Sequence, residues 1–576
     1  MKNKTKIIIA ALIILVVIVL IILITRGGIG GGAQKTAEGT SIDRSNFNTL
    51  GTFPIVKQKE TITVVIGDGS ATFNGDTNWM TKFYEEKTNV HVNWIVAPLE
   101  QFKERVNLAL ASAEKIDAVI AANHTLTAYT FNEYMRFSEQ GVILPIQDYI
   151  ETDTVYVKQN LNVQPGWREV LTLPNGNIYA FPTLNDCYHC RYYGKMWINM
   201  EFLKNVNLKV PTTTEEFRQM LIAFRDRDAN GNGNPNDEIP MMGAIDNFGA
   251  KVDTYLVSAF IYNDGQNRLF LNNGKVVAAY MEPEFQEGLR YLNQLFREGL
   301  IAKDSFTANR NERNLINSAK YESTIGAIPN IHYVIGSRET GQPVRWIDYE
   351  PIPPLKGPRG LQVTRYDHYQ KFMTTEAAGF IPATAKNPAL IMRWLDWFHS
   401  EEGNIILRYG EKGTGWIDPE PGATGPDGRP AKIKTQTLPQ DHPYYGNLVW
   451  GARFPNYNTY EMRNLLEAAP DMRAPDGSGA ERFLEVMSRQ NYEPYAQKIE
   501  NLLPPLYYSG DNVLEMTTMT TNINTYVEES IAKFVVGDMN IDTGWAAFQS
   551  NLRNLGVDRY LQIIQNAYNT SAFAKR

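Results

Sequence analysis

The sequence predicts an α/β protein of two or three domains, preceded by one apolar helix at the N-terminus. The chain has 576 residues, which is more than a single hydrophobic core usually holds. Strand-like and helix-like patterns alternate between residues 61 and 121, and this order indicates a parallel sheet with right-handed crossovers. Residues 7–24 form an uninterrupted apolar run.

The N-terminal apolar run has the length of a membrane span. As a helix it would reach about 27 Å, close to the thickness of a bilayer core, and it is longer than the apolar part of an ordinary signal peptide. Lys2, Lys4 and Lys6 precede it and favour a cytoplasmic N-terminus. We therefore predict that residues 1–26 anchor the protein in the cell membrane and that residues 27–60 form a flexible linker on the extracellular face. A cleaved signal peptide is the alternative.

The predicted parallel sheet suggests where a ligand binds. Its strands are expected at Thr61–Ile66, Val90–Val96 and Lys115–Ala121. Ligands of parallel sheets bind at the carboxyl ends of the strands. Asp68 follows the first strand, and Asn123 and His124 follow the third. No glycine-rich phosphate motif follows the first strand, which argues against nucleotide binding.

Several later helices are marked by their caps and apolar spacing. A helix is expected within Phe131–Tyr149, and Thr213 with Glu216 forms a capping box for another. The remaining signals predict helices around Phe285–Phe296, after Asn387-Pro388, and through much of Asn522–Tyr568, where Asp542 or Thr543 would be a cap.

The segment Asp226–Glu238, DRDANGNGNPNDE, matches the spacing of a calcium-binding loop. Oxygen-bearing side chains alternate, a glycine stands at the sixth position, and an acid stands at the twelfth. The pattern predicts a structural Ca²⁺ bound by Asp226, Asp228, Asn230, Asp237 and Glu238 and by the backbone carbonyl of Asn232. An Asn/Gly-rich turn without an ion is the alternative.

The stretch Cys187–Asn199, CYHCRYYGKMWIN, is interpreted as a crossing between two α/β lobes with a ligand against it. Aromatic, cationic and sulfur side chains crowd this stretch before a strand-like run. Cys187 and Cys190 are the only cysteines of the chain. His189 cannot complete a tetrahedral metal site with them, so a local disulfide or a free pair is favoured over metal or redox chemistry.

The charge argues against a nucleic-acid partner, and no catalytic motif is recognisable, although the plentiful acids leave a carboxylate pair for glycoside hydrolysis open. The net charge is −7 and no basic block follows the N-terminus. No GxSxG or HExxH motif is present. Many rings lie near predicted strand ends or in loops, where they suit the apolar faces of sugars, although core packing is the alternative for each ring. These rings are Trp79, Tyr129, Tyr188, Tyr192, Tyr193, Trp197, Trp346 and Trp416.

Four long phrases carry a family resemblance. They are residues 176–241, which begin GNIYAFPTLNDCYHC, residues 284–307 (EFQEGLRYLNQLFREGLIAKDSFT), residues 379–404 (GFIPATAKNPALIMRWLDWFHSEEGN) and residues 526–564 (YVEESIAKFVVGDMN and onward). In this order they resemble the extracellular solute-binding proteins of sugar ABC transporters, in the large oligosaccharide-binding group. The resemblance extends over about Thr61–Asn566.

The resemblance implies a fold, a site and partners. The fold would be periplasmic-binding-protein-like of type II, with lobe 1 at residues 61–185 and 375–410 and lobe 2 at residues 186–374 and 411–576. A monomer would capture an oligosaccharide between the lobes, without catalysis, and deliver it to membrane permease subunits. The alternatives are a polysaccharide-active enzyme and a sugar-sensing receptor that feeds a membrane kinase. The ligand-binding residues would be Asp68, Asn123, His124, Tyr188, Arg191, Tyr192, Asn330, His332, Trp346 and Trp416.

Overall fold

The computed structural model describes residues 43–575, except residues 69–72, 122–126, 247–248, 319–323, 334–344, 370, 373–378, 475 and 509–510. The predicted N-terminal helix at residues 7–24 lies outside the described residues, as do Asn123 and His124. By their contacts, residues 46–576 group into one unit and residues 1–45 into another.

A parallel sheet forms the centre of the first lobe, as predicted. Its strand order is β11-β3-β1-β2, with β1 at Glu60–Asp68, β2 at Val90–Pro98, β3 at Ala118–Ile120 and β11 at Gly379–Phe380. β1 runs parallel to both neighbours, and β11 is antiparallel to β3. Val64, Val65 and Ile66 are consecutive and all fully buried, because helices cover both faces of the sheet.

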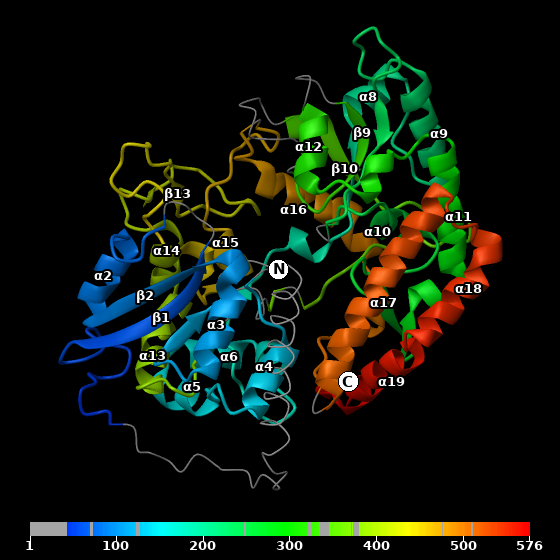
Figure 1. Cartoon of the computed structure of the whole chain (residues 1–576). Helices are drawn as coiled ribbons and strands as arrows, with labels where there is room; N and C mark the ends of the chain where they lie inside the picture. The colour runs from blue at the N-terminus through cyan, green and yellow to red at the C-terminus, as the bar shows by residue number, and fades with distance from the viewer. Residues whose placement is uncertain are drawn as a thin grey trace, which may run out of the picture. The chain divides into compact units, whose positions relative to one another are not determined.

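Helices surround this first sheet (Figure 1). They are α2 (Trp79–Thr88), α3 (Phe102–Ala111), α4 (Phe131–Glu139), α5 (Gln147–Asp153), α6 (Tyr156–Val163), α7 (Pro165–Leu171), α13 (Pro388–Asp396) and α14 (Glu401–Tyr409). The helix predicted within residues 131–149 is two helices, because Gly141 turns the chain with a φ of 66° between them. Asn387 caps α13 as predicted, with its side chain accepting from the Leu390 amide.

A second, mixed sheet forms the centre of the second lobe. Its order is β10-β5-β9-β6, with β5 at Met196–Asn199, β6 at Ile239–Met241, β9 at Ile325–Pro329 and β10 at Tyr349–Ile352. Figure 1 shows the neighbouring helices α8 (Met200–Asn205), α9 (Thr214–Asp226), α11 (Pro283–Arg297), α12 (Arg310–Ser318) and α16 (Ala480–Asn491). The predicted capping box at the start of α9 is confirmed, because Thr213 and Glu216 each bind the other's backbone amide.

The C-terminal part of the second lobe is helical, as predicted. Its long helices are α17 (Asp511–Val536), α18 (Ile541–Asn554) and α19 (Val557–Thr570). The cap of α18 is Asn540 and not Asp542 or Thr543, since the Asn540 Oδ1 accepts both of their amides at 3.0 Å. Among the residues described, no helix combines the length and apolarity needed to cross a bilayer.

Residues 447–454 pack against the first lobe, although the sequence assigns residues 411–576 to the second. The amide of Trp79 donates to the Asn447 carbonyl at 3.2 Å. The Trp450 indole donates to Thr81 Oγ1 at 3.1 Å, and its ring centroid lies 5.3 Å from that of Trp94. Ring contacts between residues more than 300 positions apart leave no periodic signal in the sequence.

Within the described part, the chain passes between the two sheets in three segments. The first segment joins β4 (Leu184–Asn185) to β5, the second runs from β10 to β11, and the third runs from β14 (Tyr457–Asn458) to α16. β14 pairs in parallel with β4, so the first and third segments start side by side. Cys187–Asn199 therefore belongs to a crossing segment, as interpreted from the sequence.

We expect Trp450→Ala to lower the free energy of unfolding by about 3–5 kcal/mol, because it leaves a cavity among buried rings of the first lobe. Urea unfolding followed by circular dichroism measures the change. Tyr445→Ala is the control, since that ring, two residues before the segment, is 43% exposed and its loss should cost less than about 0.5 kcal/mol. Equal losses for the two variants would show that residues 447–454 do not stabilise the first lobe.

Candidate functional site

A cavity of about 220 Å³ lies where the first and third crossing segments meet α14 and α16. Tyr188 and His189 line it from the first segment. The rest of the wall comes from α14, Pro426, the third segment and α16, with Arg408, Tyr409, Asn458, Tyr460, Arg463, Asn464, Glu467, Glu481 and Glu485 among its residues. We call this cavity the crossing cavity.

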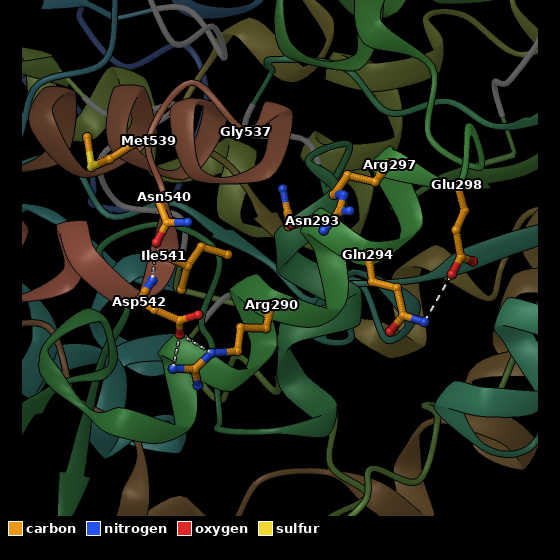
Figure 2. A pocket seen from close by; sticks show the side chains of 10 residues that line it. All are labelled: Arg290, Asn293, Gln294, Arg297, Glu298, Gly537, Met539, Asn540, Ile541 and Asp542. Atoms are coloured by element: carbon orange, nitrogen blue, oxygen red, sulfur yellow. Dashed lines mark hydrogen bonds and ion pairs between the residues drawn. The ribbon is translucent and has the colours of Figure 1, made fainter.

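A larger hollow, of about 800 Å³, lies on the second lobe alone (Figure 2). Its wall consists of the C-terminal half of α11 and the turn between α17 and α18. Figure 2 shows two pairs of polar side chains bound to each other: Arg290 binds Asp542 at 2.8 Å, and Gln294 donates to Glu298 at 3.1 Å. Because both lobes contribute to the crossing cavity and only one to this hollow, the crossing cavity is the candidate site.

Tyrosine rings and guanidinium groups gather beside the crossing cavity. The Tyr188 ring centroid lies 5.7 Å from that of Tyr192 and 6.3 Å from that of Tyr460. The guanidinium carbon of Arg489 lies 4.0 Å from the Tyr188 centroid. Arg191 forms an ion pair with Asp186 and lies 5.7 Å from the Tyr188 ring. The structure thus brings together Tyr188, Arg191 and Tyr192, which were predicted as a set.

Polar groups missed by the sequence analysis complete the cavity wall. Arg463 donates to Asn185 Oδ1 at 3.1 Å and to Glu481 Oε2 at 3.0 Å. Arg489 holds Glu485 at 2.9 Å, and the Tyr460 hydroxyl donates to the same Glu485 oxygen. These residues stand in no local motif, so only their contacts across the fold reveal them.

The charges around the cavity are set by burial and by their neighbours. His189 is 3% exposed, and burial lowers its pKa to about 4, so the imidazole is neutral at pH 7. Burial also lowers the pKa of Lys195 to about 7. For Glu481, burial opposes ionisation, but His189, His332 and Arg463 hold its pKa well below the ordinary value.

Asp68 lies at the carboxyl end of β1, as the sequence predicts, and is bound by Arg453. The distance from Arg453 Nε to Asp68 Oδ1 is 2.9 Å, and the Asp68 side chain is only 5% exposed. In the described residues, the buried Asp68 Oδ2 has no hydrogen-bond partner. Arg453 belongs to the segment that packs on the first lobe, so that segment neutralises this carboxylate.

Of the other predicted ligand-binding residues, His332 lies beside the crossing cavity, whereas Asn330, Trp346 and Trp416 do not line it. Asn330 is buried at the end of β9, and its side chain donates to the His332 carbonyl at 2.8 Å. The His332 imidazole lies 3.8 Å from Glu481, beside the crossing cavity. Trp346 is fully buried between Tyr333 and Phe483, so it faces a core and not a ligand. Trp416 is half-buried in a hairpin, donates to the Gly410 carbonyl, and is not part of the wall of the crossing cavity.

The predicted calcium loop folds around five of its six predicted ligands. Asp228 accepts from the amides of Asn232 at 3.0 Å and Gly233 at 2.8 Å. Asn230 and Asn232 each donate a side-chain amide proton to Asp237 at 3.0 Å, and the Asn230 backbone amide donates to Glu238. The buried Glu238 Oε2 has no hydrogen-bond partner in the described residues. These oxygens suit a hard cation such as Ca²⁺.

Asp226, the sixth predicted ligand, does not join this cluster. It is the last residue of α9, and Arg225 binds both of its oxygens at 2.6 and 2.9 Å. Its side chain is 52% exposed. Counting from Asp228 keeps alternating oxygens at residues 228, 230 and 232 and places Gly233, with a φ of 90°, at the sixth position. Because α9 includes Asp226, the ligand loop begins at Asp228, two residues later than the sequence pattern predicts.

Cys187 and Cys190 form a disulfide with a Cα–Cα distance of 5.3 Å. The local disulfide predicted as one of two possibilities is thus present, and neither sulfur is a thiolate for metal or redox chemistry. The disulfide closes the turn that carries Tyr188 and His189.

Two α/β lobes with a ring-lined polar cavity at their crossings define a two-lobed ligand-binding protein. The chain belongs to the bacterial extracellular solute-binding protein family, whose model matches residues 70–405. It is 24% identical over 534 residues to the fructooligosaccharide ABC transporter substrate-binding protein FusA of Streptococcus pneumoniae, with 90% of this chain and 91% of that protein covered.

Solved structures of sugar-binding proteins share the fold. One is an EF-hand mutant of FusA from S. pneumoniae in complex with fructo-nystose, which has a TM-score of 0.68 at 22% identity and covers 90% of this chain and 100% of its own. Another is a solute-binding protein from Bifidobacterium longum infantis that binds HMO, with a TM-score of 0.72 at 18% identity and coverage of 89% and 99%. These similarities confirm the predicted two-lobed architecture.

We expect Arg453→Met to destabilise the fold by about 3 kcal/mol, because it leaves the Asp68 carboxylate buried without its cation. Thermal and urea unfolding measure the loss. The double variant Asp68→Asn/Arg453→Met should regain at least about 1 kcal/mol relative to Arg453→Met, because the uncompensated charge is gone. Strict additivity of the two single changes would refute this role of Arg453.

Proposed function

We propose that this protein is the substrate-binding component of a carbohydrate ABC transporter and that it captures an oligosaccharide at the crossing cavity. The observation that carries the proposal is the wall of this cavity, in which tyrosine rings alternate with guanidinium, carboxylate and amide groups contributed by both lobes. Sugars need such a wall, because their ring faces are apolar and their hydroxyls are polar. Family membership and the sugar-binding relatives support the proposal.

In this proposal, the rings stack on the sugar and the charged groups bind its hydroxyls. Tyr188 and Tyr460 supply the faces, while Arg463 and Glu481 supply donors and acceptors. Arg191 and Tyr192 stand behind Tyr188 and position it. The remaining described candidates, Asp68, Asn330 and His332, would approach the sugar when the lobes close around it.

We propose binding without catalysis. A glycoside hydrolase needs one carboxylic acid that stays protonated near neutral pH, next to a second carboxylate. Three acids line the cavity. Glu481 has a pKa held well below its ordinary value, Glu485 is bound by Arg489 and Tyr460, and Glu467 lies 3.7 Å from the Lys434 amine. A cationic neighbour favours the ionised form of each of them, which argues against a proton donor and against the enzyme alternative.

We propose that residues 7–24 anchor the protein and that the glycine-rich segment after them tethers it at the extracellular face. The apolar run and the preceding lysines support this mode of attachment over a cleaved signal peptide. A tethered monomer next to membrane permease subunits would deliver its sugar at high effective concentration.

We also propose that Asp228, Asn230, Asn232, Asp237 and Glu238 hold one structural Ca²⁺. Support comes from the loop geometry, from the buried unpartnered oxygen of Glu238 and from the EF-hand of the relative FusA. The ion would supply positive charge at the centre of a loop whose side chains are mostly acceptors.

The sugar-binding proposal predicts that Tyr188→Ala weakens oligosaccharide affinity by at least about tenfold, equivalent to about 1.4 kcal/mol, because a stacking face is lost. Titration calorimetry of the calcium-loaded protein measures this affinity. The ligands are chosen by thermal shift from a panel of fructan, milk and plant oligosaccharides. Tyr445→Ala is the matched control and should bind as the wild type does.

Two results would contradict the sugar-binding proposal. One is the absence of a thermal shift with every oligosaccharide of the panel. The other is the release of shorter sugars from a bound oligosaccharide during long incubation, which would favour the enzyme alternative.

The calcium proposal predicts that Asp228→Ala abolishes the rise in melting temperature that Ca²⁺ causes in the chelator-treated wild type, because Asp228 orients the loop amides and donates a ligand oxygen. Asp226→Ala is the matched control and should keep this rise, since Asp226 is bound by Arg225. The prediction fails if the wild type melts at one temperature with Ca²⁺ and with chelator.

A further inference from the structure

We propose that His189, His332 and Glu481 form a binding site for one divalent transition-metal ion of the zinc class. The three side chains come from different parts of the fold: the first crossing segment, the chain after β9, and the start of α16. One potential ligand atom of each lies within 4.8 Å of the others. This site is separate from the proposed calcium loop and is independent of which sugar the protein binds.

The distances between the ligand atoms match those around a tetrahedral ion. Zinc binds histidine nitrogen and carboxylate oxygen at about 2.0–2.2 Å, so neighbouring ligand atoms in a tetrahedral shell lie about 3.3–3.5 Å apart. His189 Nε2 lies 3.4 Å from Glu481 Oε2. His332 Nε2 lies 3.8 Å from the other carboxylate oxygen, Glu481 Oε1, so both imidazoles face the same carboxylate, and this partly exposed imidazole would turn to bring its nitrogen into the shell.

The chemistry of the three groups also suits a metal. A histidine ligand must be neutral and a carboxylate ligand must be ionised. The buried His189 places an imidazole nitrogen beside Glu481, and the Glu481 carboxylate accepts from Arg463, as an anionic ligand would. Two nitrogens and one oxygen favour Zn²⁺, Co²⁺ or Ni²⁺ over Ca²⁺, which prefers a shell of oxygens.

The crossing cavity provides access to the ion. His189 and Glu481 both line this cavity, so a metal between them has a fourth position open to solvent. His189 also belongs to the turn closed by the disulfide between Cys187 and Cys190. A metal would therefore fasten the first crossing segment to α16 and to the chain after β9.

Arg463 competes with the metal for Glu481. Its Nη2 lies 3.0 Å from Glu481 Oε2, the same oxygen that faces His189. A cation between His189 and Glu481 must share this oxygen with the guanidinium, which lowers the affinity. Removing the guanidinium should therefore strengthen metal binding, whereas removing a ligand should weaken it.

The test uses the full chain in detergent, stripped of metal by a chelator, with Ca²⁺ present and no sugar. Titration with Co²⁺ should give one saturable set of d–d absorption bands per chain, and Zn²⁺ should abolish them. His332→Ala and Glu481→Gln should each weaken Co²⁺ binding at least about tenfold, and Arg463→Gln should strengthen it. His442→Ala is the matched control, because this histidine accepts the Tyr444 amide outside the cluster.

Two outcomes would overturn the metal site: no saturable Co²⁺ absorption in the wild type, or Co²⁺ binding by His332→Ala with wild-type affinity. Circular dichroism of each variant establishes that it is folded. If His332→Ala is unfolded, Glu481→Gln, which preserves the shape of the side chain, tests the site in its place. Because no sugar takes part, failure here leaves the sugar-binding proposal untouched, and failure of sugar binding leaves the metal site untouched.

Discussion

The buried amine of Lys195 holds the first crossing segment in place, and the arrangement of the candidate site depends on it. Its Nζ donates to the carbonyl of His189 at 2.8 Å and to the carbonyl of Tyr192. These carbonyls belong to a short turn. The His189 carbonyl also accepts the Tyr192 amide at 3.3 Å, so the loss of Lys195 would mainly leave the Tyr192 carbonyl unpaired, at a cost of about 1–3 kcal/mol. This turn carries Tyr188, His189 and Arg191 and so sets their orientation.

Around this turn, the wall of the cavity combines tight polar pairing with accessible rings. Arg463, Glu481, Glu485 and Arg489 bind one another or nearby side chains, and this pairing offsets the loss of water around charges at the crossing. Such a pre-ordered wall suits recognition, because little side-chain entropy remains to be lost when a ligand arrives. It suits acid–base catalysis poorly at Glu481, because the pKa of this carboxyl is held well below its ordinary value.

Local sequence patterns predicted much of the fold and part of the site. Alternation and β-branching identified β1, β2 and β3, and the capping box at Thr213 identified the start of α9. The spacing predicted a calcium-binding loop, but Asp226 and Asp228 satisfy the same alternation. Only the end of α9, where Arg225 binds Asp226, separates these two registers. The rings of Trp197 and Trp346 belong to the core, since composition cannot tell a core ring from a cleft ring.

The sequence by itself determined the class of fold, the crossing segment, and the presence of Tyr188, Arg191 and Tyr192 at that crossing, whereas the structure decided that Cys187 and Cys190 form a disulfide. Periodicity, caps and cysteine count are properties of short stretches, so they can be read without coordinates. The tertiary structure alone decided which distant residues face that segment. Tyr460, Arg463 and Glu481 lie more than 250 positions further along the chain, and Trp450 packs on the first lobe. Such contacts depend on how the lobes pack, and packing between distant segments leaves no local pattern.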